Sequence, residues 1–210
     1  MNTNNSNLKT MKTNFLYLNS MKTSKLFVAA MFCLTLITSC SDDDDPVIIN
    51  PEELITNVTL TFTNTGNATD IVTMSSVAPD GQDGSFTNIV VGSFTSGETY
   101  SLDLAITNES ESPADDVLND DIIPEADEHF FTYGVNTVSM TMSRDAGDVD
   151  GPDGNKLGVN TTWIAGGASN GSLNITLVHE PVGSDDSNNF GTVTGGEEDF
   201  NITFSGVSIN

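Results

Sequence analysis

The segment Thr99–Thr107, with the sequence TYSLDLAIT, decides the fold class because apolar and polar side chains alternate along it. Its apolar residues fall at positions 100, 102, 104 and 106, with Ser, Asp and Ala between them. A period of two predicts an antiparallel strand with one buried face and one solvated face. The segment LNITL at residues 173–177 repeats the pattern. The chain is therefore expected to be built from half-buried strands.

Short runs rich in Val, Ile, Thr and Phe, separated by Gly, Asn and Asp, extend this pattern through the chain. Eight or nine strands at short spacing predict an all-β fold, an immunoglobulin-like two-sheet antiparallel sandwich. A small β-barrel is the alternative. The predicted strands are Leu54–Thr63, Asp70–Val77, Phe86–Gly92, Thr99–Thr107, His129–Val135, Thr137–Met142, Leu157–Ile164, Gly171–Glu180 and Phe200–Ile209.

One segment, Glu109–Asp127, interrupts the strands. Its composition predicts a long acidic loop with one helical turn around Ala114–Leu118. Loops of this length inside a compact domain are usually either functional or disordered. Residues 54–210 are predicted to form a single β-sandwich domain.

The N-terminal region has the pattern of an export signal. A basic stretch, Met21–Lys25, precedes the apolar run Leu26–Thr38, which is too short to span a bilayer as a helix. The run ends at Ile37-Thr-Ser-Cys40, which resembles the lipobox of bacterial lipoproteins and implies lipidation of Cys40. Residues 1–39 are thus expected to be a removed signal segment, with translation starting at Met21 in preference to an unusually long basic region. The alternative to a lipobox is an ordinary secretory signal or a membrane anchor.

An acidic run follows the lipobox directly. Ser41, Asp42, Asp43, Asp44 and Asp45 resemble the Bacteroidota signal that sends lipoproteins to the cell surface. Residues 40–53 then form a lipidated acidic tether. The alternative is a solvated spacer that keeps the domain off an anionic membrane. The resemblance implies a lipid anchor in the outer membrane, facing the cell exterior.

The charge of the expected mature chain limits its partners. All thirty acidic residues lie after Cys40, against two basic ones, Arg144 and Lys156. Nucleic-acid affinity comes from basic side chains that neutralise phosphates, so nucleic acid is excluded as a partner. Cys33 leaves with the signal and Cys40 is acylated, so disulfides, cysteine-ligated zinc and a cysteine nucleophile are excluded as well.

Two histidines with acidic neighbours form the first candidate site, in Asp127-Glu128-His129 and His179-Glu180. Both have the parity of the apolar face, His129 at the start of its strand and His179 at the end. Antiparallel pairing of these strands would bring both imidazoles to one end of the sandwich. Imidazoles with carboxylates suit Zn²⁺, Cu²⁺ or Ni²⁺. The alternative is that each histidine only caps the rim of the core.

An Asp/Gly segment is the second candidate site. Closely spaced oxygen side chains and glycines for tight turning suit a Ca²⁺ loop, although the spacing departs from the EF-hand pattern. The alternative is a hairpin turn. The candidate ligands are Asp145, Asp148, Asp150, Asp153 and Asn155.

The motifs favour binding over catalysis. The sequence holds no Gly-rich phosphate loop, no nucleophile elbow and no HExxH. No catalytic residue is assigned, and a hydrolase is disfavoured. The preferred function is a non-enzymatic module that binds a surface protein or a glycan, or that acts as an accessory to an outer-membrane transporter. The alternative is capture of a metal or a haem-like ligand for a TonB-dependent receptor.

Four stretches resemble a family of small Bacteroidota surface lipoproteins: Glu52–Thr59, Asn108–Pro113, Asp127–Phe130 and Leu177–Pro181. The resemblance covers most of the expected mature chain. Members often carry the label "type 1 periplasmic binding fold", which implies alternating helices and strands. This sequence does not support such an α/β fold, so the all-β prediction stands.

Overall fold

The computed structural model describes residues 53–81 and 84–210, which belong to one compact unit spanning Pro51–Asn210. Cys40, the acidic run 41–45 and the signal segment lie outside the described residues. Within the described part, no helix has the length and apolar character needed to cross a membrane.

The larger sheet has six strands in the order β3-β2-β1-β4-β7-β6, all paired antiparallel. Its first four strands are joined by the β1–β2 and β2–β3 hairpins and by the pairing of β1 with β4. Apolar residues alternate inward in β4, where every even-numbered position is buried. The bounds are β1 (Asn57–Asn64), β2 (Asn67–Val77), β3 (Thr87–Val91), β4 (Thr99–Thr107), β6 (Met140–Arg144) and β7 (Thr161–Ala165).

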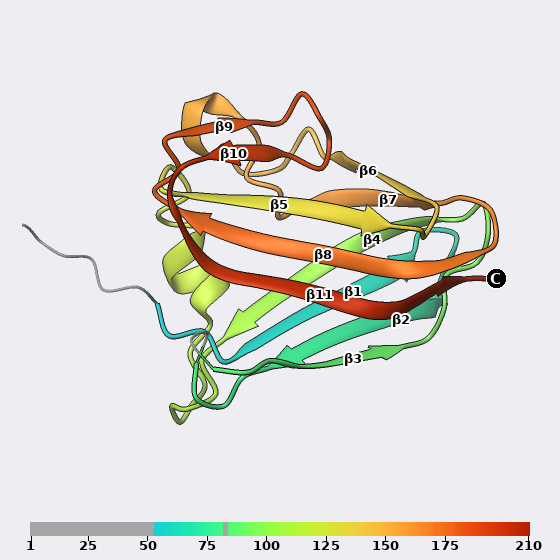
Figure 1. The fold of residues 1–210 in the computed structure, drawn as a ribbon, viewed down its shortest axis with the longest axis horizontal. Coiled ribbons are helices and arrows are strands. Elements are labelled where there is room, and N and C mark those ends of the chain that lie inside the picture. The colour runs from blue at the N-terminus through green and yellow to red at the C-terminus, as the bar shows by residue number, and fades with distance from the viewer. Residues whose placement is uncertain (1–52, 82–83) are drawn as a thin grey trace, which may run out of the picture. The chain divides into compact units, whose positions relative to one another are not determined.

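The smaller sheet has three antiparallel strands in the order β11-β8-β5. A two-stranded ribbon, β9 with β10, is separate. Figure 1 shows the three-stranded sheet as a layer against β1–β4, with the ribbon beyond β5. The bounds are β5 (His129–Asn136), β8 (Ser169–His179), β9 (Gly183–Asp185), β10 (Thr192–Thr194) and β11 (Glu197–Ile209).

One hydrophobic core joins the two sheets. Phe62 of β1 and Tyr133 of β5 come from opposite sheets, and both pack edge-on against the buried Trp163 of β7. In the described residues the antiparallel sheets stay open, which confirms the two-sheet sandwich and not the barrel.

The structure corrects several predicted strand boundaries. The strand predicted at Thr137–Met142 begins at Met140, because Thr137 has φ +62° and turns the chain between β5 and β6. The strand predicted at Leu157–Ile164 begins at Thr161, and Leu157 is buried within a loop. The short ribbon strands β9 and β10 were not predicted.

The acidic segment 109–127 contains one helical turn, at Leu118–Ile122 and not at Ala114–Leu118. Asp115 instead pairs with Asn108 through two backbone hydrogen bonds, which closes a short loop around Pro113. The turn forms where Leu118 and Ile122 can be buried, because packing of an apolar face supplies most of the stability of so short a helix. The turn leads the chain to the start of β5.

Candidate metal centre

The two histidines face each other across neighbouring strands. His129 opens β5, His179 closes β8, and the antiparallel register pairs them directly. This is the arrangement that strand parity predicts, at the end of the sheet where β8 finishes and β5 begins (Figure 1). Both residues are buried, His129 completely and His179 with 7% exposure.

The two imidazole rings are stacked, with centroids 4.8 Å apart and planes 8° from parallel. A metal ion lies close to the plane of an imidazole that binds it, about 2 Å from the nitrogen. Parallel stacked rings have separate planes, so one ion cannot lie in both. The histidines are therefore close enough for a shared site, but their orientation assigns each ring to its own set of neighbours.

His179 belongs to an outer group with Glu128 and Glu180. Their nearest ligand atoms all lie within 4.8 Å of one another, and His179 Nε2 is 3.6 Å from Glu128 Oε2. Nε2 of His179 is buried and has no hydrogen-bond partner. A buried polar atom without a partner costs free energy, so this nitrogen is suited to a ligand.

The backbone holds the two glutamates of this outer group together. Glu180 N–H donates to the Glu128 carbonyl at 2.7 Å, which continues the β5–β8 ladder past the histidines. Glu180 also has φ +46°, a left-handed conformation that costs a non-glycine residue of order 1 kcal/mol or more. Glu128 is half-buried and Glu180 is exposed, so the group opens toward solvent.

His129 belongs to an inner group with Glu53 and Asp199. Its Nε2 lies 3.8 Å from Glu53 Oε2 and 4.0 Å from Asp199 Oδ2, and its Nδ1 is 3.1 Å from the Glu125 carbonyl oxygen. Burial alone would lower the pKa of His129, but Glu53, the Glu125 carbonyl and Asp199 together outweigh it and raise that pKa. The contact with His129 lowers the pKa of the Glu53 carboxyl, against a smaller opposing effect of burial.

The sequence predicted the three residues of the outer group and His129 of the inner group, but not Glu53 or Asp199. Asp127, also a predicted ligand, is exposed and lies outside the cluster that the other three form. Glu53 and Asp199 carried no local signal, because each is far from the histidines in the sequence. A bulge in β11 explains Asp199: the register shifts between Glu198 and Phe200.

The predicted Ca²⁺ ligands do not converge. Asp148 is buried, and its carboxylate accepts hydrogen bonds from three backbone N–H groups, those of Val149, Gly158 and Asn160. The other four have different partners: Asp145 accepts from Thr162, Asp150 pairs with Lys156, Asp153 accepts from Ser184 N–H, and Asn155 donates to Ser184.

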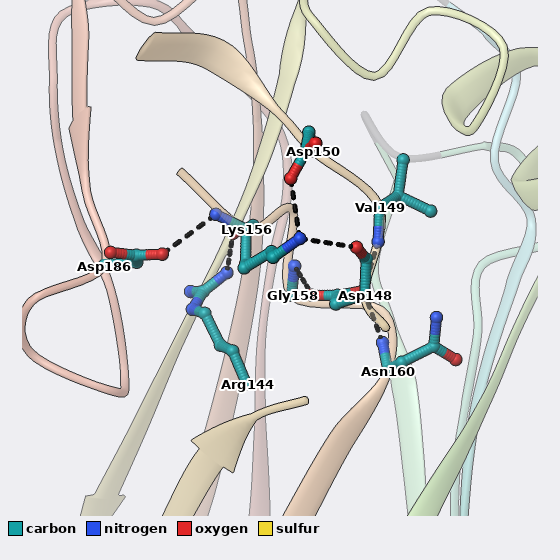
Figure 2. A network of polar contacts seen from close by, with 8 residues as sticks. All are labelled: Arg144, Asp148, Val149, Asp150, Lys156, Gly158, Asn160 and Asp186. Carbon is teal, nitrogen blue, oxygen red and sulfur yellow. Dashed lines mark hydrogen bonds and ion pairs between the residues drawn. The ribbon is translucent and has the colours of Figure 1, made fainter. Parts of the chain in front are cut away.

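The ammonium group of Lys156 lies between Asp148 and Asp150 of the loop, as Figure 2 shows. Lys156 Nζ donates to Asp150 Oδ1 at 2.6 Å and to the Asp148 carbonyl at 3.0 Å. The Arg144 guanidinium donates to the carbonyls of Lys156 and Phe131 and lies 4.6 Å from the Phe130 ring centroid. Of the two basic residues after Cys40, Arg144 in β6 ties the loop to β5, and Lys156 closes the loop on itself.

No protein-family model, no curated protein and no solved structure matches this chain. The outer and inner groups are therefore interpreted from their own geometry.

Proposed function

We propose that this chain is a lipid-anchored protein of the outer-membrane surface whose sandwich is a non-enzymatic binding module, and that the ligand is a divalent transition-metal ion. The observation that carries the proposal is the outer group. His179 Nε2 is buried without a hydrogen-bond partner, and two glutamates lie within 4.8 Å of it. One imidazole and two carboxylates, with a side open to solvent, suit Zn²⁺ or Cu²⁺.

The depth of the histidines favours a bare ion over a haem-like ligand. Axial ligation requires the imidazole nitrogen to reach the iron at the centre of a wide macrocycle. Side-chain exposures of 0% for His129 and 9% for His179 leave no room for such a plane without opening the sheet end. An ion that retains water on its exposed side could pass to a TonB-dependent receptor or another surface protein.

The acidic surface supports the capture of cations. Thirty acidic residues against two basic ones after Cys40 draw cations toward the domain and raise their local concentration. Zn²⁺ titration of the chain tests the proposal. Binding that disappears in the paired variant Glu128→Gln/Glu180→Gln supports it. Binding that is unchanged in this variant, or absent from the unmodified chain, rejects the outer group as the site.

The anchor makes a separate prediction. Replacing Cys40 with Ser should abolish acylation, because the serine hydroxyl cannot form the thioether that joins the lipid, and the protein should leave the membrane fraction. Labelling with a radioactive fatty acid and fractionation measure both effects. Cys33→Ser is the matched control and should remain membrane-bound. A Cys40→Ser protein that is still acylated would rule out the lipobox.

The acidic run predicts the side of the membrane. Replacing Asp42, Asp43, Asp44 and Asp45 with Ala should leave the lipid in place and retain the domain on the periplasmic side, because the run is the proposed export signal. Digestion of intact cells with an external protease measures exposure. A variant in which Asp115 and Asp116 of the domain are both replaced with Ala is the control for the loss of negative charge. Undiminished digestion of the four-residue variant would remove the run as an export signal.

A further inference from the structure

The outer group offers a metal ion three ligands. His179 presents Nε2, which is buried and has no hydrogen-bond partner, and Glu128 and Glu180 each present a carboxylate oxygen. Among residues 53–81 and 84–210, no fourth His, Cys, Asp or Glu joins these three. Structural zinc has four protein ligands, whereas zinc with three protein ligands keeps one position for water or an incoming molecule. The outer ion therefore has one position that another molecule can fill.

The spacing within the group indicates a tetrahedral ion. His179 Nε2 and Glu128 Oε2 are 3.6 Å apart. Zinc bonds of about 2.0–2.2 Å at tetrahedral angles place two ligands roughly 3.3–3.6 Å apart. A square-planar ion, the geometry typical of Cu²⁺, would separate them by about 3 Å or about 4 Å with bonds of similar length. The spacing favours Zn²⁺, with the fourth ligand at the remaining corner of the tetrahedron.

The fourth position is on the solvent side of the group. The side chain of His179 is 9% exposed, that of Glu128 is 43% exposed, and Glu180 is an exposed residue. The imidazole thus reaches the ion from the interior, and the two glutamates hold it at the surface. Val182, two residues after Glu180 in the chain, is 84% exposed. A chain that approaches the ion can therefore also make an apolar contact.

Charge determines the chemistry of the fourth ligand. Two glutamates neutralise a divalent ion, and Glu197 lies opposite His179 in the sheet register. A third carboxylate, or a thiolate, would make the site negative in a domain with thirty acidic residues against two basic ones after Cys40. A neutral imidazole binds Zn²⁺ without adding charge. Basic residues around that imidazole would also be attracted to the acidic domain.

A second copy of this chain cannot supply the imidazole. The chain has two histidines, and both are buried at the same end of the sheet. Another copy could offer only carboxylates, and two strongly acidic domains repel each other. We propose that a histidine in a basic segment of a different protein is the fourth ligand of the outer ion, so that Zn²⁺ joins the two chains. This bridge rests on the proposed function of the outer group.

The test is the binding of a fluorescent peptide to the full chain, purified in detergent and loaded with Zn²⁺. The peptide is Lys-Gly-His-Gly-Lys with blocked ends, and Lys-Gly-Phe-Gly-Lys is its control. Anisotropy should show tighter binding of the histidine peptide, by more than the roughly tenfold that a residue behind a metal ligand contributes. This difference should disappear after the metal is removed with EDTA.

A pair of variants shows whether the peptide binds at the outer group. Glu128→Gln/Glu180→Gln should lose the preference for the histidine peptide. Glu198→Gln, an exposed neighbour in β11, is the matched control and should retain it. Equal affinity for the two peptides in the Zn²⁺-loaded chain would overturn the bridge. Zinc that leaves the chain with the peptide, without a complex of all three, would overturn it as well.

Titration with Zn²⁺ alone separates failure of the bridge from failure of the proposed function. If Glu128→Gln/Glu180→Gln removes a bound ion, but the loaded chain does not distinguish the two peptides, only the bridge is wrong. If the chain binds no Zn²⁺, or the paired variant keeps the ion, the proposed function fails and the bridge fails with it.

Discussion

Replacing His179 with phenylalanine is expected to remove the ion from the outer group, with a loss of affinity greater than the roughly 10–100-fold typical of residues behind a metal ligand. Phenylalanine preserves the buried ring but has no nitrogen for the ion. The same change at His129 should leave the outer ion in place, because the stacked rings serve different carboxylates. Isothermal titration with Zn²⁺ measures both variants.

Glu180→Gln shows whether each histidine variant still binds the outer ion. Adding it should lower Zn²⁺ binding in His129→Phe, where the outer group is intact, and should change nothing in His179→Phe. Glu197→Gln, another exposed carboxylate near His179 in the sheet register, is the matched control and should have no effect in either. Equal and complete loss of binding in both histidine variants would indicate one shared ion and contradict the separation into two groups.

Replacing Asp148 with alanine is expected to lower the free energy of unfolding by roughly 3–5 kcal/mol. Its carboxylate accepts from the backbone N–H groups of Val149, Gly158 and Asn160 at 3.0, 2.7 and 2.8 Å. The buried Gly158 N–H left without an acceptor costs about 1–3 kcal/mol, and the hydrogen bonds from the less buried Val149 and Asn160 contribute about 1 kcal/mol each. The Asp148 carboxylate also holds Gly158 in place. At Gly158 φ is +99° and a Cβ would collide with the Arg144 guanidinium, so the backbone there packs tightly. Urea unfolding followed by circular dichroism measures the loss.

Asp150→Ala is the matched control for Asp148→Ala. Asp150 is exposed and only pairs with Lys156, so its loss should cost at most about 1 kcal/mol. We also expect added Ca²⁺ to leave the unfolding midpoint unchanged, since the loop carboxylates already have partners. Equal midpoints for the two variants would contradict the structural role of Asp148. A rise in the unfolding midpoint on addition of Ca²⁺ would instead support the prediction that this segment binds calcium.

The alternation of apolar residues predicted most of the fold. Strands such as Thr99–Thr107 show a clear period of two, and their observed bounds agree with the sequence. Parity also placed His129 and His179 on one face, and antiparallel pairing then put them in register. Short polar strands gave no such signal: β9 is Gly-Ser-Asp, and β10 follows a Gly-containing turn.

The composition of the site was harder to predict from the sequence. A bulge shifts the parity of every residue on one side of it, so the inward direction of Asp199 follows from the register of β11 and not from its sequence. Glu53 reaches His129 from 76 residues away, a contact set by tertiary packing. In the Asp/Gly segment, residue types suggest calcium, but they do not show that backbone amides occupy the Asp148 carboxylate.

The claim that the two histidines do not share one metal ion is tested most directly by crystals grown with Zn²⁺. Diffraction is measured at the zinc absorption edge. We predict an anomalous peak about 2 Å from His179 Nε2, in contact with carboxylate oxygens of Glu128 and Glu180. A single peak bonded to both imidazoles, or no peak at this end of the sheet, would contradict the account.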